Sequence, residues 1–327
     1  YMGHRQQFTA LAPTQPAWVC VAAAMQPAGP WFKPALRPGT KGENCVLMID
    51  GLVNVEVTRR ETDWTMSATR RAMGTNAQAG IFVYRSTDGL SWLPESSDPV
   101  IDVTAQVIEP AKYPRVGVRS RLVWDSWEER FVGFVDLPSE VYGDARGILK
   151  GEFHAEDGWP AVLNAGNTPS IMGPTAEDLF EGKRYTDMVG WREGSAWLGL
   201  VLRQKDTCPW VGEVIAASSR DGENWVPIVD EVSGEDVFIA PSVLEGLPNA
   251  SIESLSGGRP ADADGSWYYL VGGTNQAVCS GEPAAGGALL YRSRAVGIAG
   301  LTVSPQAPGV VITRPLRLKD GMIGAAL

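Results

Sequence analysis

The sequence predicts an all-β fold, a five-bladed β-propeller, from a recurring turn, the interval at which it recurs, and the strand-like runs between its copies. The segment 84-YRSTDGLSW-92 carries the pattern Ser-x-Asp-Gly-x-x-Trp after an apolar run, and 217-ASSRDGENWVPI-228 repeats it. Residues 153–162 keep a shortened Asp-Gly-Trp version. Self-similarity at a near-constant interval is typical of repeat architectures, in which each repeat is one structural unit.

The interval between turns sets the number of units. The anchoring glycines are separated by 60, 69, 64 and 75 residues: Gly29, Gly89, Gly158, Gly222 and Gly297. Five units in 327 residues are about 65 residues each, which is enough for a four-stranded blade with long loops. We therefore expect a single domain, 1–327, with approximate blades 41–105, 106–175, 176–240, 241–305, and 1–40 plus 306–327.

The segments between the turns have the composition of short strands. "DWTMSAT", "RLVWDSWEERFVGFV", "AWLGLVLRQ" and "SWYYLVGG" alternate apolar and polar residues or are wholly apolar, and they are rich in Val, Trp, Tyr and Leu. No segment has a sustained helical period, and "TAEDLFEG" allows at most one helical turn. A tandem of β-sandwiches is the alternative, but it does not predict the 65-residue interval.

The repeated Asp-box-like turn has a structural explanation. Asp and Ser side chains accept hydrogen bonds from nearby backbone N–H groups, Gly adopts positive φ, and Trp packs beneath the turn. We expect Asp88 and Asp221 to stabilise their turns rather than to perform catalysis.

Composition excludes several function classes. The net charge is −10, from 28 basic and 38 acidic residues, which argues against binding to nucleic acid or to an anionic membrane. No uncharged apolar run reaches 18 residues, so no membrane insertion is expected. The only histidines are His4 and His154, with no GxSxG or CxxC motif. We therefore expect no metal and no cofactor, and any acid–base chemistry would fall to carboxylates.

Cysteine usage bears on the compartment. The even number of Cys without metal-site spacing, together with the sequon at Asn249, favours a secreted or extracytoplasmic protein. Cys208 and Cys279 lie in loops of consecutive predicted blades and could form a disulfide. Cys20 and Cys45 lie in or beside neighbouring strands, and they either pair or remain buried thiols.

The segments 81-IFVYRSTDGLSW-92 and 214-VIAASSRDGENW-225 resemble the strand-and-turn unit of the five-bladed propeller glycosidases, glycoside hydrolase families 32, 43 and 68 and their uncharacterised relatives. Further segments are similar to parts of these proteins in the same order and together cover most of the chain: 29–47, 121–135, 185–202 and 312–318. The resemblance implies a carbohydrate site at the mouth of the channel, built from the first strands of successive blades. It also implies three acidic residues, since protonating the leaving group and activating the attacking group need carboxylates in different protonation states.

Three carboxylates are the candidates for this chemistry. Asp187 begins an inner strand in "YTDMV", and Glu253 precedes the fourth blade's "SWYYLVGG" as a candidate general acid. Asp50 is the third, although Asp50-Gly51 also suits a turn. Asp125 and Asp136 are weaker options, and Asp125 fits a turn.

Basic residues occupy strands where the resemblance implies acids. Arg119 and Arg121 share one face of a predicted strand, because alternate side chains of a strand point the same way. With Arg184, Tyr185 and Trp191 they are the candidate substrate contacts, and guanidinium groups would favour an anionic glycan. The alternative is that the arginines pair with Asp and Glu on neighbouring blades.

Three functional hypotheses follow. The first is a glycoside hydrolase-like enzyme acting on a glycan, with a partly basic channel that favours an anionic one. The second is a non-catalytic propeller that binds a glycan or a protein partner. The third is a structural subunit of a larger assembly.

Overall fold

The computed structural model describes seventeen segments of the chain: 2–4, 17–23, 30, 32–36, 43–60, 62–70, 80–102, 120–125, 127–138, 146–153, 170–193, 195–205, 212–230, 234–240, 251–256, 266–274 and 286–294. Within these ranges the chain is mostly β-strand with almost no helix, which confirms the all-β prediction. The one helix there, α1 (Ala176–Phe180), has five residues and a capping box between Thr175 and Asp178. None of the described helical structure is long and apolar enough to cross a bilayer.

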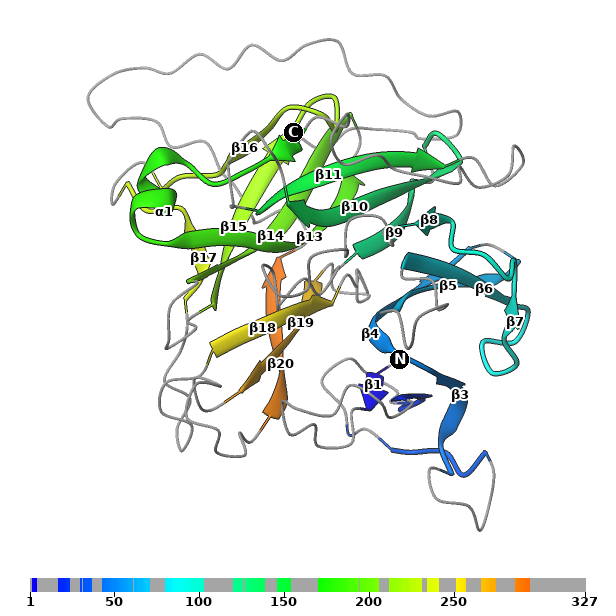
Figure 1. Ribbon diagram of the computed structural model, residues 1–327. Coiled ribbons are helices and arrows are strands. Elements are labelled where there is room, and N and C mark those ends of the chain that lie inside the picture. Colours follow the sequence, from blue (N-terminus) through cyan, green and yellow to red (C-terminus); the bar gives the residue numbers. More distant parts are fainter. Residues whose placement is uncertain are drawn as a thin grey trace, which may run out of the picture.

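The described strands form five antiparallel sheets, each built from consecutive parts of the chain (Figure 1). The β1–β3 sheet contains β1 (Met2–His4), β2 (Ala17–Cys20) and β3 (Cys45–Ile49). The β4–β8 sheet contains β4 (Leu52–Arg59), β5 (Trp64–Arg70), β6 (Gly80–Ser86), β7 (Leu93–Pro94) and β8 (Ile101–Asp102). The β9–β12 sheet contains β9 (Ser120–Asp125), β10 (Arg130–Pro138), β11 (Arg146–Phe153) and β12 (Ser170–Met172).

Two further sheets complete the described structure. The β13–β17 sheet contains β13 (Lys183–Glu193), β14 (Ala196–Lys205), β15 (Gly212–Ser219), β16 (Trp225–Pro227) and β17 (Val237–Ile239). The β18–β20 sheet contains β18 (Ser251–Ser256), β19 (Ser266–Thr274) and β20 (Gly286–Arg294). In each of the five sheets the first strand in the chain is also an edge strand, and four of these strands are β4, β9, β13 and β18. These edge strands contact one another in the sequence β4–β9–β13–β18, so they form the meeting line of the four sheets.

Apolar side chains fill the spaces between neighbouring sheets. One cluster joins the β9–β12 and β13–β17 sheets through Phe134, Trp197 and Trp225, whose rings meet edge to face. Gly190 and Gly199, a cross-strand pair of β13 and β14, leave the room that Phe134 and Trp225 occupy. Other clusters join the β13–β17 sheet to β18 and the β1–β3 sheet to the β4–β8 sheet.

The two full copies of the repeated turn have matching hydrogen bonds. One oxygen of Asp88 accepts from the backbone N–H groups of Leu90 and Ser91, both at 2.7 Å. The corresponding oxygen of Asp221 accepts from the N–H groups two and three residues later, both at 2.8 Å. Gly89 and Gly222 have φ of 73° and 77°, and Trp92 and Trp225 are buried. The carboxylates therefore stabilise turns, as the sequence pattern indicates.

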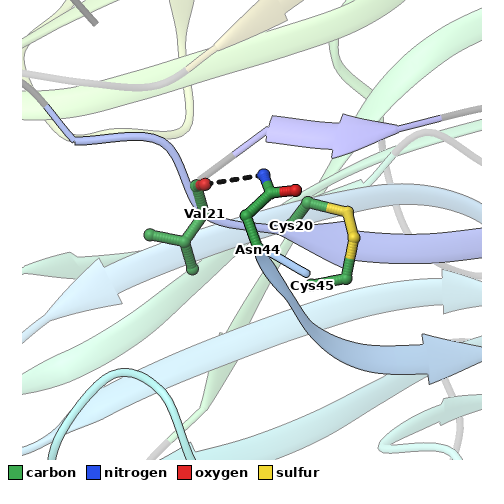
Figure 2. The surroundings of a disulfide bond; sticks show 4 residues. All are labelled: Cys20, Val21, Asn44 and Cys45. Atoms are coloured by element: carbon green, nitrogen blue, oxygen red, sulfur yellow. Dashed lines mark hydrogen bonds between the residues drawn. A yellow bond between two sulfur atoms is a disulfide. The ribbon is translucent and has the colours of Figure 1, made fainter. Parts of the chain in front are cut away.

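A disulfide joins Cys20 of β2 to Cys45 of β3, so the alternative of two buried thiols is wrong for this pair (Figure 2). The two residues are cross-strand partners. Beside them, the backbone of Val21 donates to the carbonyl of Asn44, and the Asn44 side-chain amide donates back to the Val21 carbonyl, both at 2.8 Å. Cys208 and Cys279 lie outside the described residues.

Candidate site where the first strands meet

A buried arginine connects the first strands of four sheets. Arg121 of β9 is 1% exposed and donates two hydrogen bonds to Asp187 of β13, Nε to Oδ1 at 2.9 Å and Nη2 to Oδ2 at 2.7 Å. Its Nη1 donates to Glu56 of β4 at 2.5 Å, and its Nη2 also donates to the Leu255 carbonyl of β18. The Leu255 N–H donates in turn to Asp187 Oδ2 at 3.3 Å. We call Glu56, Arg121, Asp187 and Leu255 the four-strand cluster.

Backbone irregularities help to place these groups. The pairing of β13 with β14 shifts register between Tyr185 and Asp187, so Thr186 is an extra residue immediately before the carboxylate. The pairing of β18 with β19 shifts in the same way between Ile252 and Ser254, which makes Glu253 the extra residue. A β-bulge re-aims the side chains beside it, and bulges are common next to active sites.

The charges within the four-strand cluster sum to −1, since one guanidinium faces two carboxylates. Burial opposes the charge of Arg121, but the charges and hydrogen bonds of Asp187 and Glu56 outweigh it and raise the pKa of Arg121 above its usual value. The bidentate pair with Arg121 requires the ionised form of Asp187, because both carboxylate oxygens act as acceptors. Arg121 is thus paired with acids of neighbouring sheets.

The other predicted substrate contacts lie in different surroundings. Tyr185 is fully buried in the core between the β9–β12 and β13–β17 sheets, and its hydroxyl donates to Asp178 at 3.1 Å. Burial and the nearby Asp178 charge raise the pKa of Tyr185. Arg184 and Trp191 are half-buried in β13, and Trp191 packs against the core shared with β18. Arg119 lies outside the described residues.

A second arginine, Arg203 of β14, is the centre of a network of ion pairs in the β13–β17 sheet. Its guanidinium donates to Asp236 at 2.7 and 2.8 Å, to Glu213 at 2.7 Å and to Asp178 at 3.2 Å. Burial lowers the pKa of Arg203, but the hydrogen bond to Asp236 and the surrounding negative charges outweigh it and raise that pKa. Arg203 therefore fixes α1 and the start of β17 against β14.

The remaining candidate carboxylates are dispersed. Asp50 is exposed in the turn between β3 and β4, where its carbonyl oxygen accepts from Arg70 Nε at 3.2 Å. Asp125 ends β9, and its oxygens accept from the Trp127 N–H at 3.0 Å and from Arg192 at 3.2 Å, as suits a turn residue. Glu253 and Asp136 lie in β18 and β10, and only their backbone positions are described. No group of three or more His, Cys, Asp or Glu side chains within the described ranges is arranged to hold a metal ion.

Sequence reasoning missed Glu56. It lies in 54-NVEVTRRE-61, close to Arg59 and Arg60. The available signal was an acid between Val55 and Val57 in a strand-like run, since a carboxylate there must face a partner when the strand is buried.

No protein-family model matches the chain, and no curated protein matches it by sequence. Solved structures do match. A Cellvibrio cellulosa α-L-arabinanase complexed with arabinohexaose aligns at a TM-score of 0.50 and 11% identity, over 88% of this chain and 90% of that one. An N-acetylgalactosamine deacetylase from F. plautii, in complex with blood group B trisaccharide, aligns at a TM-score of 0.52 and 12% identity, over 77% and 70%.

An exo-1,5-α-L-arabinanase from a bovine ruminal metagenomic library aligns at a TM-score of 0.48 and 14% identity, over 78% of this chain and 75% of that one. This chain covers 67% of the length of one further matched glycoside hydrolase structure and 66% of the length of another. At these identities the likeness concerns the fold. The resemblance to propeller glycosidases predicted from the sequence is confirmed at that level.

Proposed function

We propose that this protein is a glycan-active, glycoside hydrolase-like propeller whose five blades are the five sheets and whose turns at Asp88 and Asp221 are Asp-box turns. Its candidate site lies where β4, β9, β13 and β18 meet. One observation carries this proposal: side chains and backbone from all four first strands converge on Arg121, with Asp187 and Glu56 as its acidic partners. The carbohydrate ligands of the two structural relatives support a glycan as the ligand class.

In this proposal the three acids divide the chemistry. Asp187 is 1% exposed and ionised, so it orients its neighbours instead of donating a proton. It holds the backbone of Leu255, two residues after Glu253, which we assign as the general acid. The third candidate, Asp50, is exposed in the turn between β3 and β4, and its assignment as the base or nucleophile rests on the resemblance to propeller glycosidases alone. The assignment follows the requirement for carboxylates in different protonation states on the two sides of the scissile bond.

Fewer residues are proposed to contact the ligand than the sequence alone indicated. Arg121 already faces two carboxylates, so it offers no free charge to an anionic glycan. The other candidate contacts with a glycan are still Arg119, Arg184 and Trp191, as the sequence indicates. The disulfide between Cys20 and Cys45 supports an extracytoplasmic location, because disulfides persist in oxidising compartments.

A second function is favoured by the burial of the cluster. Asp187 and Glu56 are 1% and 7% exposed, which suits residues that hold the sheets together in a non-catalytic glycan-binding propeller.

The two functions differ in turnover. We expect the wild type to cleave at least one member of a panel of neutral and sulfated oligosaccharides. Glu253→Gln should lower kcat roughly 100-fold or more, as expected for loss of a general acid. Glu223→Gln, in an exposed turn, is the matched control and should retain activity. Binding measured by calorimetry without turnover would favour the non-catalytic function, and neither binding nor turnover would overturn both.

A further inference from the structure

One face of strands β4 and β5 is polar, although Glu56, Thr65 and Ser67 on it are buried. Cross-strand partners point to the same face of a sheet, so Glu56 and Ser67 lie on one face, as do Thr58 and Thr65. This face looks onto β9: Glu56 accepts from Arg121, and the Thr58 hydroxyl donates to the Leu122 carbonyl at 3.3 Å. The opposite face packs against the β1–β3 sheet through an apolar cluster.

Two hydroxyls on the polar face have no hydrogen-bond partner among the residues that the structure describes. Thr65 and Ser67 of β5 are 1% and 3% exposed, and neither Oγ1 of Thr65 nor Oγ of Ser67 is bonded to another group of the described chain. Being two residues apart on a strand, they point the same way. A buried hydroxyl without a partner destabilises the folded state, and native proteins satisfy such groups with other protein groups or with ordered water.

We propose that a buried water binds beside Thr65 and Ser67, at an internal hydration site, and bridges both hydroxyls to the carboxylate of Glu56. Its position follows from register, since Ser67 is the direct cross-strand neighbour of Glu56 at the Cβ spacing of about 5 Å typical of such pairs. The chemistry fits, because a hydroxyl can both donate and accept and a carboxylate accepts, which gives a buried water the two to four polar partners it needs.

The hydration site makes Thr65 and Ser67 positioning residues for Glu56. Arg121 holds Glu56 from the β9 side, and the water holds it from the β5 side, so the carboxylate is fixed between two neighbouring sheets. This inference goes beyond the proposed function and does not depend on turnover, since it concerns hydration and stability.

The test combines a high-resolution crystal structure with two substitutions. These substitutions should change the stability of the protein in opposite directions, depending on whether the site holds a water or is dry. We expect a water oxygen within hydrogen-bond distance of Thr65, Ser67 and Glu56. Thr65→Val and Ser67→Ala should each raise the unfolding equilibrium constant roughly 3- to 10-fold, because a satisfied hydrogen bond is lost. If the hydroxyls are instead dry and unsatisfied, both substitutions should lower that constant.

Thr58→Val is the matched control, since its hydroxyl has a protein partner on the same face and its loss should destabilise in either case. A dry site, a water that does not reach Glu56, or stabilisation by Thr65→Val would each overturn the proposal.

Discussion

At the residue scale, Arg121 is the side chain on which the buried charges depend. Removing one member of a buried ion cluster leaves the others charged and unpaired, which is far more costly than losing an exposed pair. Arg121→Met should therefore destabilise the protein by about 3–5 kcal/mol in chemical denaturation, because Asp187 and Glu56 would remain buried without a cation.

Arg85→Ala is the control for this prediction. Arg85 also pairs with two carboxylates, Asp63 and Glu95, but its side chain is 34% exposed, so its loss should cost about 1 kcal/mol or less. Adding Asp187→Asn to Arg121→Met should recover part of the loss, since one uncompensated charge disappears. Equal effects of Arg121→Met and Arg85→Ala would contradict the importance of the cluster.

The turn carboxylates give a pH-dependent prediction. Hydrogen bonds from the backbone of Ser91 and Leu90 lower the pKa of Asp88 below its usual value of about 3.9. A lowered pKa contributes stability that is present above the unfolded value and is lost as the pH falls through the folded value. Asp88→Ala should therefore lower the Tm at pH 7, with a smaller difference from wild type near pH 2.

The comparison should include Asp98→Ala, an exposed carboxylate outside the turn, which we expect to change the Tm little at either pH. An Asp88→Ala penalty that stays constant from pH 7 to pH 2 would show that the ionised carboxylate is not what stabilises the turn.

At the element scale, β15 approaches β18 where no side chain fits. A Cβ on Gly212 would collide with the backbone carbonyl of Ile252, whereas a Cβ on Gly199 would meet Trp225 and Met188 side chains at 2.8 and 2.9 Å. Side chains can shift, but a strand backbone shifts only with its sheet. We expect Gly212→Ala to cost about 3 kcal/mol or more and Gly199→Ala about 1–2 kcal/mol, measured by denaturant titration. The reverse order would mean that β15 and β18 are not in close contact.

The disulfide between Cys20 and Cys45 stabilises the β1–β3 sheet because it limits the conformations of the unfolded chain. It closes a loop with a sequence separation of 25 residues, for which the chain-entropy estimate is roughly 3 kcal/mol. The double variant Cys20→Ala/Cys45→Ala should lose about that much, and reductant should destabilise the wild type but not the variant. A wild-type Tm that does not respond to reductant would contradict this prediction.

Strands and turns could be predicted from the sequence because their signals are local. The alternation in "DWTMSAT" and the Ser-x-Asp-Gly-x-x-Trp pattern each span fewer than ten residues, and the structure has strand β5 and two matching turns there. Bulges are different, because nothing in "YTDM" alone shows that Thr186 lacks a cross-strand partner. That shift depends on how β13 pairs with β14.

At the scale of the whole molecule, the site depends on contacts that no local pattern contains. Arg121 meets Glu56, Asp187 and Leu255 across sequence separations of 65, 66 and 134 residues. The sequence suggested both that arginines face inward and that they pair with acids of neighbouring blades, but only the arrangement of the sheets selects the second for Arg121. Glu56 was missed for the same reason, since its partner lies in another sheet.

If Arg121 couples the sheets, replacing it should reduce the protection of backbone amides from hydrogen exchange in all four first strands together. Hydrogen exchange of Arg121→Met should increase in β4, β9, β13 and β18 together, because each contributes a group to the same guanidinium. Arg85→Ala should raise exchange only near its own partners in the β4–β8 sheet. Faster exchange confined to β9 after Arg121→Met would mean that the sheets are held by their apolar cores alone and that the cluster couples nothing.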